Sequence, residues 1–241
     1  MSIWLHGDLS GVNPRAELEL LRGTVSDAVR DGHDLRAFWT GLAELDPVAC
    51  AELAIGPRAL NDPAAVRSVL CVAPVLETIM SASGLYSRLV ALAPSEAGEI
   101  ARHAAQRHPD ASWLWRVGRA DPGPMFEALC AHDEPQAILA AWRAEHYDLA
   151  LSRVRTADDR ALNTIYRSNN PAFLERCLAA ILEAGGSQPV VPWLAAWHGP
   201  QIDGTFARVA LRLESAEARR RLLAVSADLP ITRRHLEAQH E

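Results

Sequence analysis

Glu99 and His103 are the residues whose types and spacing come nearest to a metal site. They stand four positions apart, so one face of a helix would carry both side chains, and His108 follows shortly after them. A carboxylate and an imidazole at this spacing can hold a divalent ion. A complete site needs more ligands than this pair supplies. We therefore treat Glu99 and His103 as weak metal candidates and favour a solvated Glu–His pair.

Two further clusters bring titratable groups together in the sequence. Cys130 precedes His132, but a Cys–His nucleophile needs facing side chains and a third group that orients the base, which neighbours at one helix end do not provide. His146 stands between Glu145 and Tyr147, and an acid–base role there requires a pocket that shifts pKa values. A buried His/carboxylate cluster of Glu99, His103 and His146 is the basis of our alternative hypothesis, an all-α enzyme or a binder of a small ligand or metal.

Several catalytic classes have no motif here. The chain contains no G-x-S-x-G, no H-E-x-x-H and no G-x-G-x-x-G pattern. It also contains no lysine, because all 24 basic residues are arginine. This excludes Schiff-base and P-loop chemistry, which need the lysine amine. We interpret the missing lysine as a compositional bias, with selection against amines as the alternative. We expect no cofactor, and a protein that is not an enzyme is the better reading.

Charge and aromatic residues indicate the class of partner. The formal net charge of the 241-residue chain is −6, which does not favour nucleic acid, because affinity for nucleic acid rests on neutralising phosphates. Trp193 and Trp197 are neighbours on one face of a short apolar segment, and tryptophan is enriched at the centres of protein interfaces. Arg219, Arg220 and Arg221 could fork onto partner carboxylates. We expect these five residues to contact another protein.

The sequence predicts helix after helix. Asn or Asp precedes proline five times, and such a pair can cap and open a helix, although it can also open a turn. Apolar residues then recur at steps of three and four, most clearly over residues 171–184, where Gly185 ends the pattern. No sustained alternation of apolar and polar residues predicts a strand. The expected fold is all-α, built from stacked antiparallel helix pairs, with a closed helical bundle as the alternative.

Part of this pattern resembles a known fold family. Residues 215–229 are similar to the second helix of a HEAT-type repeat, residues 62–80 look like another such helix, and helix-opening prolines recur about once per helix pair. The resemblance implies a fold style, an α-solenoid, and no functional residue. We expect one helical domain over residues 1–231 and a polar C-terminal tail over residues 232–241 that is free to fray.

Cellular location and function follow from the remaining features. The four cysteines lie in apolar segments without C-x-x-C spacing. Unpaired cysteines of this kind are typical of proteins in a reducing compartment. No apolar run reaches the ~20 residues of a membrane span, and the first residues do not resemble a signal peptide. We therefore expect a cytoplasmic protein of bacterial type without a membrane role. The leading hypothesis is a non-enzymatic protein–protein interaction module, an adaptor or scaffold. A nucleic-acid-binding helical repeat ranks third.

Overall fold

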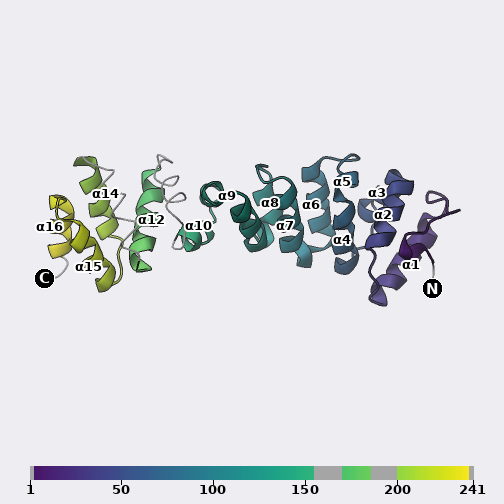
Figure 1. The fold of residues 1–241 in the computed structure, drawn as a ribbon, viewed down its shortest axis with the longest axis horizontal. Helices are drawn as coiled ribbons and strands as arrows, with labels where there is room; N and C mark the ends of the chain where they lie inside the picture. Colours follow the sequence, from purple (N-terminus) through teal and green to yellow (C-terminus); the bar gives the residue numbers. More distant parts are fainter. Residues whose placement is uncertain (1–2, 155–169, 186–199, 239–241) are drawn as a thin grey trace. The chain divides into compact units, whose positions relative to one another are not determined.

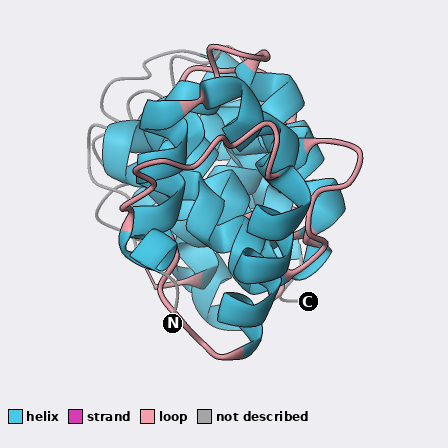
Figure 2. Cartoon of the chain, turned by 90° about the vertical axis from the view of Figure 1, so that its right-hand side faces the viewer, coloured by secondary structure: helices cyan, strands magenta, loops and turns pink. Residues whose placement is uncertain are grey.

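The structure is a computed structural model, and it describes residues 3–154, 170–185 and 200–238. Within these ranges the chain forms α-helices, short 3₁₀-helices and loops and contains no strand (Figure 2). The prediction of an all-α fold is confirmed. No helix in the described ranges combines the length and the hydropathy that a bilayer span requires.

Contacts divide the chain into two compact units, Met1–His132 and Asp133–Glu241, where the sequence suggested one domain. The boundary falls inside α9 (Gly123–Arg143), at Asp133, whose backbone is extended rather than helical (φ −150°, ψ 93°). Asp133 accepts a hydrogen bond from the backbone N–H of Gln136, and Pro135 follows within the helix. The second half of α9 therefore begins like a new helix, with its own acidic cap.

Unit 1 is a succession of short helices in which neighbours in the sequence pack against each other (Figure 1). Contacts join α2 to α3 and α4, and α6 to α7 and α8. The α-helices of unit 1 before α9 are α1 (Leu18–Arg30), α2 (Arg36–Leu45), α3 (Pro47–Ile55), α4 (Pro63–Val69), α5 (Ala73–Leu76), α6 (Ala82–Leu92), α7 (Ala97–Arg107) and α8 (Leu114–Val117). The 3₁₀-helices are η1 (Ile3–His6), η2 (Leu70–Val72), η3 (Pro94–Glu96) and η4 (Gly118–Ala120).

Three of the five Asx-Pro pairs cap helices as predicted. Asp46, Asp62 and Asn170 each stand at an N-cap with the side chain accepting backbone N–H groups of the first turn, and proline follows at the first helical position. Asn13 differs, because its side chain accepts from the backbone N–H of Ala16 and opens a turn before α1. After Asp121, α9 begins at Gly123.

The core of unit 1 contains large aromatic side chains that are almost completely buried. Phe38, Trp39 and Tyr86 are at most 1% exposed, and the Phe38 and Trp39 rings meet edge to face with centroids 5.3 Å apart. Burying such a side chain fully stabilises a fold by about 2–3 kcal/mol relative to leaving it exposed. Trp39 of α2 also donates to Ser68 of α4 at 2.9 Å, and the Tyr86 ring of α6 lies 6.2 Å from the His103 ring of α7. These side chains therefore join the helices that line the hollow described below.

Unit 2 is also helical in its described residues. Besides the second half of α9 it contains α10 (Tyr147–Val154), α12 (Pro171–Glu183), α14 (Pro200–Ala210), α15 (Ala216–Val225) and α16 (Pro230–Ala238). The apolar face predicted for α12 is buried as expected: Phe173, Leu174, Leu178, Ile181 and Leu182.

We expected residues 232–241 to form a polar C-terminal tail, and the structure corrects this expectation over residues 232–238. Residues 230–238 form α16, and both Thr232 and Leu236 are buried. The reason is a distant cap: the Asp203 carboxylate of α14 accepts the backbone N–H groups of Ile231 (2.7 Å) and Thr232 (2.8 Å). The first N–H groups of a helix have no partner within it, and a carboxylate that accepts them stabilises the first turn. Here the carboxylate, Asp203, is remote in sequence from α16.

Candidate functional site

An open hollow of about 380 Å³ lies on unit 1. Its walls come from three places in the chain: the start of α2, the run from α4 into η2, and the middle of α7. The polar side chains that line it are Asp34, Arg36, Arg67, Ser68, Cys71, Glu99 and His103. Small and apolar residues, Ala64 and Leu70, complete the wall.

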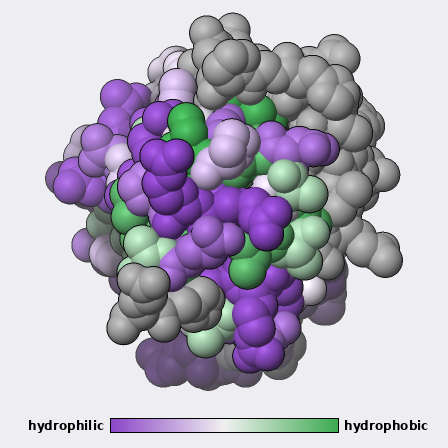
Figure 3. All heavy atoms as spheres, turned by 90° about the vertical axis from the view of Figure 1, so that its left-hand side faces the viewer, coloured by the Kyte–Doolittle hydropathy of each residue, from purple (hydrophilic) through white to green (hydrophobic). Residues whose placement is uncertain are grey.

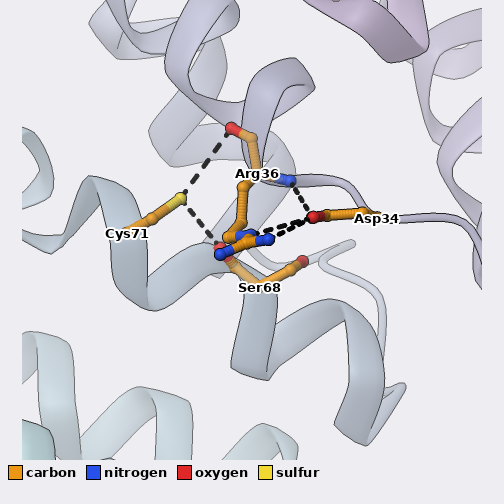
Figure 4. Close-up of polar contacts among 4 residues, drawn as sticks. All are labelled: Asp34, Arg36, Ser68 and Cys71. Atoms are coloured by element: carbon orange, nitrogen blue, oxygen red, sulfur yellow. Dashed lines mark hydrogen bonds and ion pairs between the residues drawn. The ribbon is translucent and has the colours of Figure 1, made fainter.

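Asp34 and Arg36 form a tight local pair at one wall (Figure 4). The Arg36 Nε donates to both carboxylate oxygens of Asp34, at 3.1 and 3.0 Å, and the Arg36 backbone N–H donates to Oδ1 at 3.0 Å. Hydrogen bonds from the guanidinium and from that N–H hold the pKa of Asp34 at about 2. The carboxylate is therefore ionised at neutral pH, and the pair presents no net charge to the hollow.

Ser68 and Cys71 direct their hydrogens to backbone oxygens. The Ser68 hydroxyl donates to the Ala65 carbonyl at 2.7 Å and accepts from the buried Trp39 indole N–H at 2.9 Å. The Cys71 thiol lies 3.0 Å from the Ser68 carbonyl and 3.9 Å from that of Arg36 (Figure 4). Burial raises the pKa of Cys71, so the thiol stays protonated at neutral pH. In the part of the chain that the structure describes, neither group has the adjacent base that a nucleophile needs.

The part of the wall that α7 forms holds the two weak metal candidates. Both lie on α7 and both line the hollow, as their spacing predicted. Glu99 is engaged by both Nε and an Nη of Arg102, and the Nε distance is 2.9 Å. Hydrogen bonding to Arg102 is the main reason that the pKa of Glu99 is lowered. No group of three or more His, Cys, Asp or Glu side chains in the described part of the chain is arranged to hold a metal ion.

His103 has an unfilled hydrogen-bonding position. Its Nε2 is buried and has no hydrogen-bond partner among the residues that the structure describes. Burial, reinforced by Arg107, lowers the pKa of His103, so the ring is neutral at neutral pH. A buried polar atom without a partner costs about 1–3 kcal/mol, and such atoms are uncommon in folded proteins. This nitrogen is closed off from solvent, although His103 as a residue lines the hollow.

Arg67 is the basic residue of the hollow with the loosest partner. Its side chain is 57% exposed, and its Nε lies 3.6 Å from Glu96. The Arg36 and Arg102 guanidinium groups have much closer carboxylates. A hydrogen-bond acceptor that enters the hollow would therefore engage Arg67 at the least cost in broken ion pairs.

Of the five residues predicted to bind a partner, the structure describes the three arginines. Trp193 and Trp197 lie outside the described residues. Arg219 donates to the carbonyl of Leu213, in the loop before α15, at 2.9 Å, and Arg221 donates to the carbonyl of Leu182, near the end of α12, at 2.8 Å. Arg220 is 68% exposed and pairs with Glu217 at 3.0 Å. On the face of unit 2 that α15 and α16 form, hydrophilic side chains alternate with hydrophobic ones (Figure 3).

Sequence reasoning missed most of the hollow. Asp34, Arg67 and Cys71 were not singled out, because segments about thirty residues apart build the site and no local motif marks it. The other member of the predicted His/carboxylate cluster, His146, belongs to unit 2, whereas Glu99 and His103 belong to unit 1. Its backbone N–H donates to the Ala141 carbonyl in the turn between α9 and α10.

Comparison of the chain with protein-family models, with curated proteins and with solved structures finds no match.

Proposed function

We propose that this protein is a non-enzymatic interaction module, an adaptor or scaffold in the cytoplasm of a bacterial-type cell. In this proposal the hollow of unit 1 receives a polar segment of a partner protein. The observation that carries it is the hollow itself: an open concavity of about 380 Å³, lined by charged and hydrogen-bonding side chains from three segments of the chain. The stacked helix pairs that we expect for this fold would hold such a surface rigid.

The chemistry of the walls supports binding rather than catalysis. The charges of Asp34 and Glu99 are neutralised within the protein by Arg36 and Arg102, so the hollow carries little net charge. The hydrogens of Ser68 and Cys71 point to carbonyl oxygens, so neither side chain is activated. Hydrogen-bonding groups in an open concavity suit a polypeptide segment, which supplies both donors and acceptors.

The proposal is tested by blocking the hollow with a group attached to the Cys71 thiol, which lines it. Cys71 is exposed whereas Cys50, Cys130 and Cys177 are buried, so N-ethylmaleimide modifies the native protein at Cys71. The tagged protein, with and without this modification, is used to capture proteins from an extract of its native cells. The matched control moves the modified thiol to an exposed position on α1, as Ser26→Cys in a Cys71→Ser background.

At least one captured protein should be lost when Cys71 is modified and retained when the control protein carries the same group on its relocated thiol. Equal capture by all three forms, or capture of background proteins alone, contradicts the proposal. The comparison separates filling of the hollow from any general effect of the reagent.

A second candidate function, binding of a small ligand or metal, is favoured by the unpartnered Nε2 of His103. A thermal-shift screen of polar metabolites and divalent cations tests it, because a ligand present at a hundred times its Kd stabilises the native state by about 2.7 kcal/mol. A hit that His103→Leu abolishes supports this candidate. The absence of any stabilising compound, together with no metal in the purified protein, ends it.

A further inference from the structure

Unit 2 carries an arginine whose guanidinium group lies over two aromatic rings. The Arg176 guanidinium carbon, on α12, is 5.3 Å from the ring centroid of Tyr147 and 5.7 Å from that of Trp142. Both distances fall within the ~6 Å range of a cation–π contact. Contact with two rings restrains the position of the guanidinium group.

The rings beneath Arg176 form a packed platform. The Trp142 ring centroid lies 4.6 Å from that of Tyr147 and 4.3 Å from that of Phe173, which is fully buried. The turn between α9 and α10 brings Tyr147 back onto Trp142, and Glu145 adopts a left-handed backbone conformation there (φ 66°). A non-glycine residue in this region costs free energy, so the surrounding packing must impose the turn.

The edge of the Arg176 guanidinium is not used by the rest of the described chain. Among the residues that the structure describes, no hydrogen bond or ion pair involves the Arg176 side chain, and the residue is exposed. Its neighbour Glu175 is buried and is already bound by Arg208 (2.5 Å) and Arg212 (3.4 Å). As far as the described residues go, the N–H donors of Arg176 are therefore restrained by the rings and not engaged by an acceptor.

We propose that Arg176, Trp142 and Tyr147 form a second contact point for a partner polypeptide, which places an Asp or Glu carboxylate on the Arg176 fork. A planar guanidinium binds a carboxylate through two parallel hydrogen bonds, and the exposed part of Tyr147 supplies adjoining apolar surface. Trp, Tyr and Arg are also the residue types that dominate binding energy at protein interfaces. This inference rests on the proposed function and names the chemistry of its partner.

The surroundings favour a carboxylate over a phosphate group. Glu145 and Asp148 are exposed carboxylates that flank Tyr147 in the sequence, and the whole chain carries a formal charge of −6. Both oppose a dianionic phosphate more strongly than a monoanionic side chain. A polypeptide segment that presents a single Asp or Glu carboxylate is therefore the partner that we infer.

Nuclear magnetic resonance of arginine Nε–H groups tests the site directly. The ¹⁵N-labelled full-length protein is titrated with three acetylated and amidated hexapeptides that differ at one position, with glutamate, glutamine or phosphoserine next to a leucine. The Arg176 signal is identified by its absence in Arg176→Gln. Arg234→Gln, at an exposed position of α16, is the matched control.

The glutamate peptide should shift the Arg176 Nε–H signal saturably, and the glutamine peptide should not. Arg176→Lys lacks this signal and is followed through the Trp142 indole N–H; it should weaken the binding by about tenfold, because the planar fork is lost. No shift, an equal shift with glutamine, or a preference for phosphoserine overturns the inference. Failure of the peptides with Cys71-dependent capture intact overturns this site alone, and loss of that capture overturns the proposed function.

Discussion

At the residue scale, Glu77 illustrates how one carboxylate joins several helices of unit 1. Arg107 donates to both of its oxygens, at 3.0 Å each, and the Tyr86 hydroxyl donates to Oε1 at 3.1 Å. The His108 Nε2 lies 3.0 Å from the same Oε1. Burial alone would raise the pKa of Glu77, but the hydrogen bonds from Arg107 and His108 outweigh it and lower the pKa to about 2.

Replacement of Glu77 by Gln should destabilise the protein in a pH-dependent manner. Because the folded-state pKa lies below its ordinary value of 4.5, the ionised group contributes stability above that pH and loses it as the pH falls toward 2. We expect Glu77→Gln to lower the free energy of unfolding by about 2–3 kcal/mol near pH 7 and by much less near pH 2. Urea unfolding followed by circular dichroism measures the difference.

Glu44→Gln is the control for this experiment, since Glu44 is exposed on α2. It should change the free energy of unfolding by less than about 0.5 kcal/mol at every pH. A cost for Glu77→Gln that does not vary with pH would mean that the carboxylate charge is not what stabilises the cluster.

At the element scale, helix positions are set by close backbone approaches as well as by apolar faces. A Cβ atom on Gly41 of α2 would lie 2.7 Å from the carbonyl oxygen of Gly7, which itself has a positive φ of 83°. A Cβ atom on Gly23 of α1 would meet nothing within 4 Å. The two glycines occur in similar helix interiors, but only the first is required by packing.

Alanine substitution should therefore have opposite effects at these two glycines. Gly23→Ala should stabilise the protein by up to about 1 kcal/mol, because alanine is the better helix former. Gly41→Ala should destabilise it by about 1–3 kcal/mol, because backbone atoms must move apart. Thermal unfolding of the two variants provides the comparison, and stabilisation by both would refute the close approach of η1 and α2.

Asp203 provides a second prediction at this scale. Asp203→Ala removes the acceptor of two backbone N–H groups at the start of α16 and of the Thr232 hydroxyl. The expected cost is about 2–3 kcal/mol, with faster amide exchange over residues 230–238. Asp228→Ala, at an exposed position just before α16, should leave both quantities nearly unchanged. Unchanged exchange in Asp203→Ala would show that α16 does not depend on this cap.

The local part of the fold was predictable, and the long-range part was not. The Asp46 and Asp62 caps and the buried face of α12 follow from neighbouring residues, whose geometry the sequence specifies directly. The cap that Asp203 supplies to α16 depends on a contact between distant segments. The hollow is similar: Glu99 and His103 were found by their spacing, whereas Asp34 and Cys71 reach the site through tertiary packing.

At the scale of the whole molecule, the chain is built from two units with separate cores. The buried residues Trp39 and Tyr86 belong to unit 1, and Phe173 and Phe206 belong to unit 2. Apolar periodicity does not distinguish one large domain from two small ones, since amphipathic helices bury a similar stripe in either arrangement. The extended backbone at Asp133 marks the division, and the sequence signals it by the proline at position 135.

Unit 1 should fold without unit 2. A chain of 132 residues with this core buries enough surface to be stable on its own. We expect a fragment of residues 1–132 to be helical by circular dichroism and to unfold cooperatively in urea. A fragment that is soluble but lacks a cooperative transition would show that unit 1 depends on the rest of the chain.

The claim that a partner occupies the hollow is tested most directly by the reactivity of Cys71 in the complex. The rate of its modification by a thiol reagent is measured in the native protein, alone and with a saturating amount of the purified partner, while the other three cysteines are buried. The account predicts that the partner slows this reaction by about tenfold or more, because the bound segment covers the thiol. An unchanged rate in the fully formed complex would contradict it.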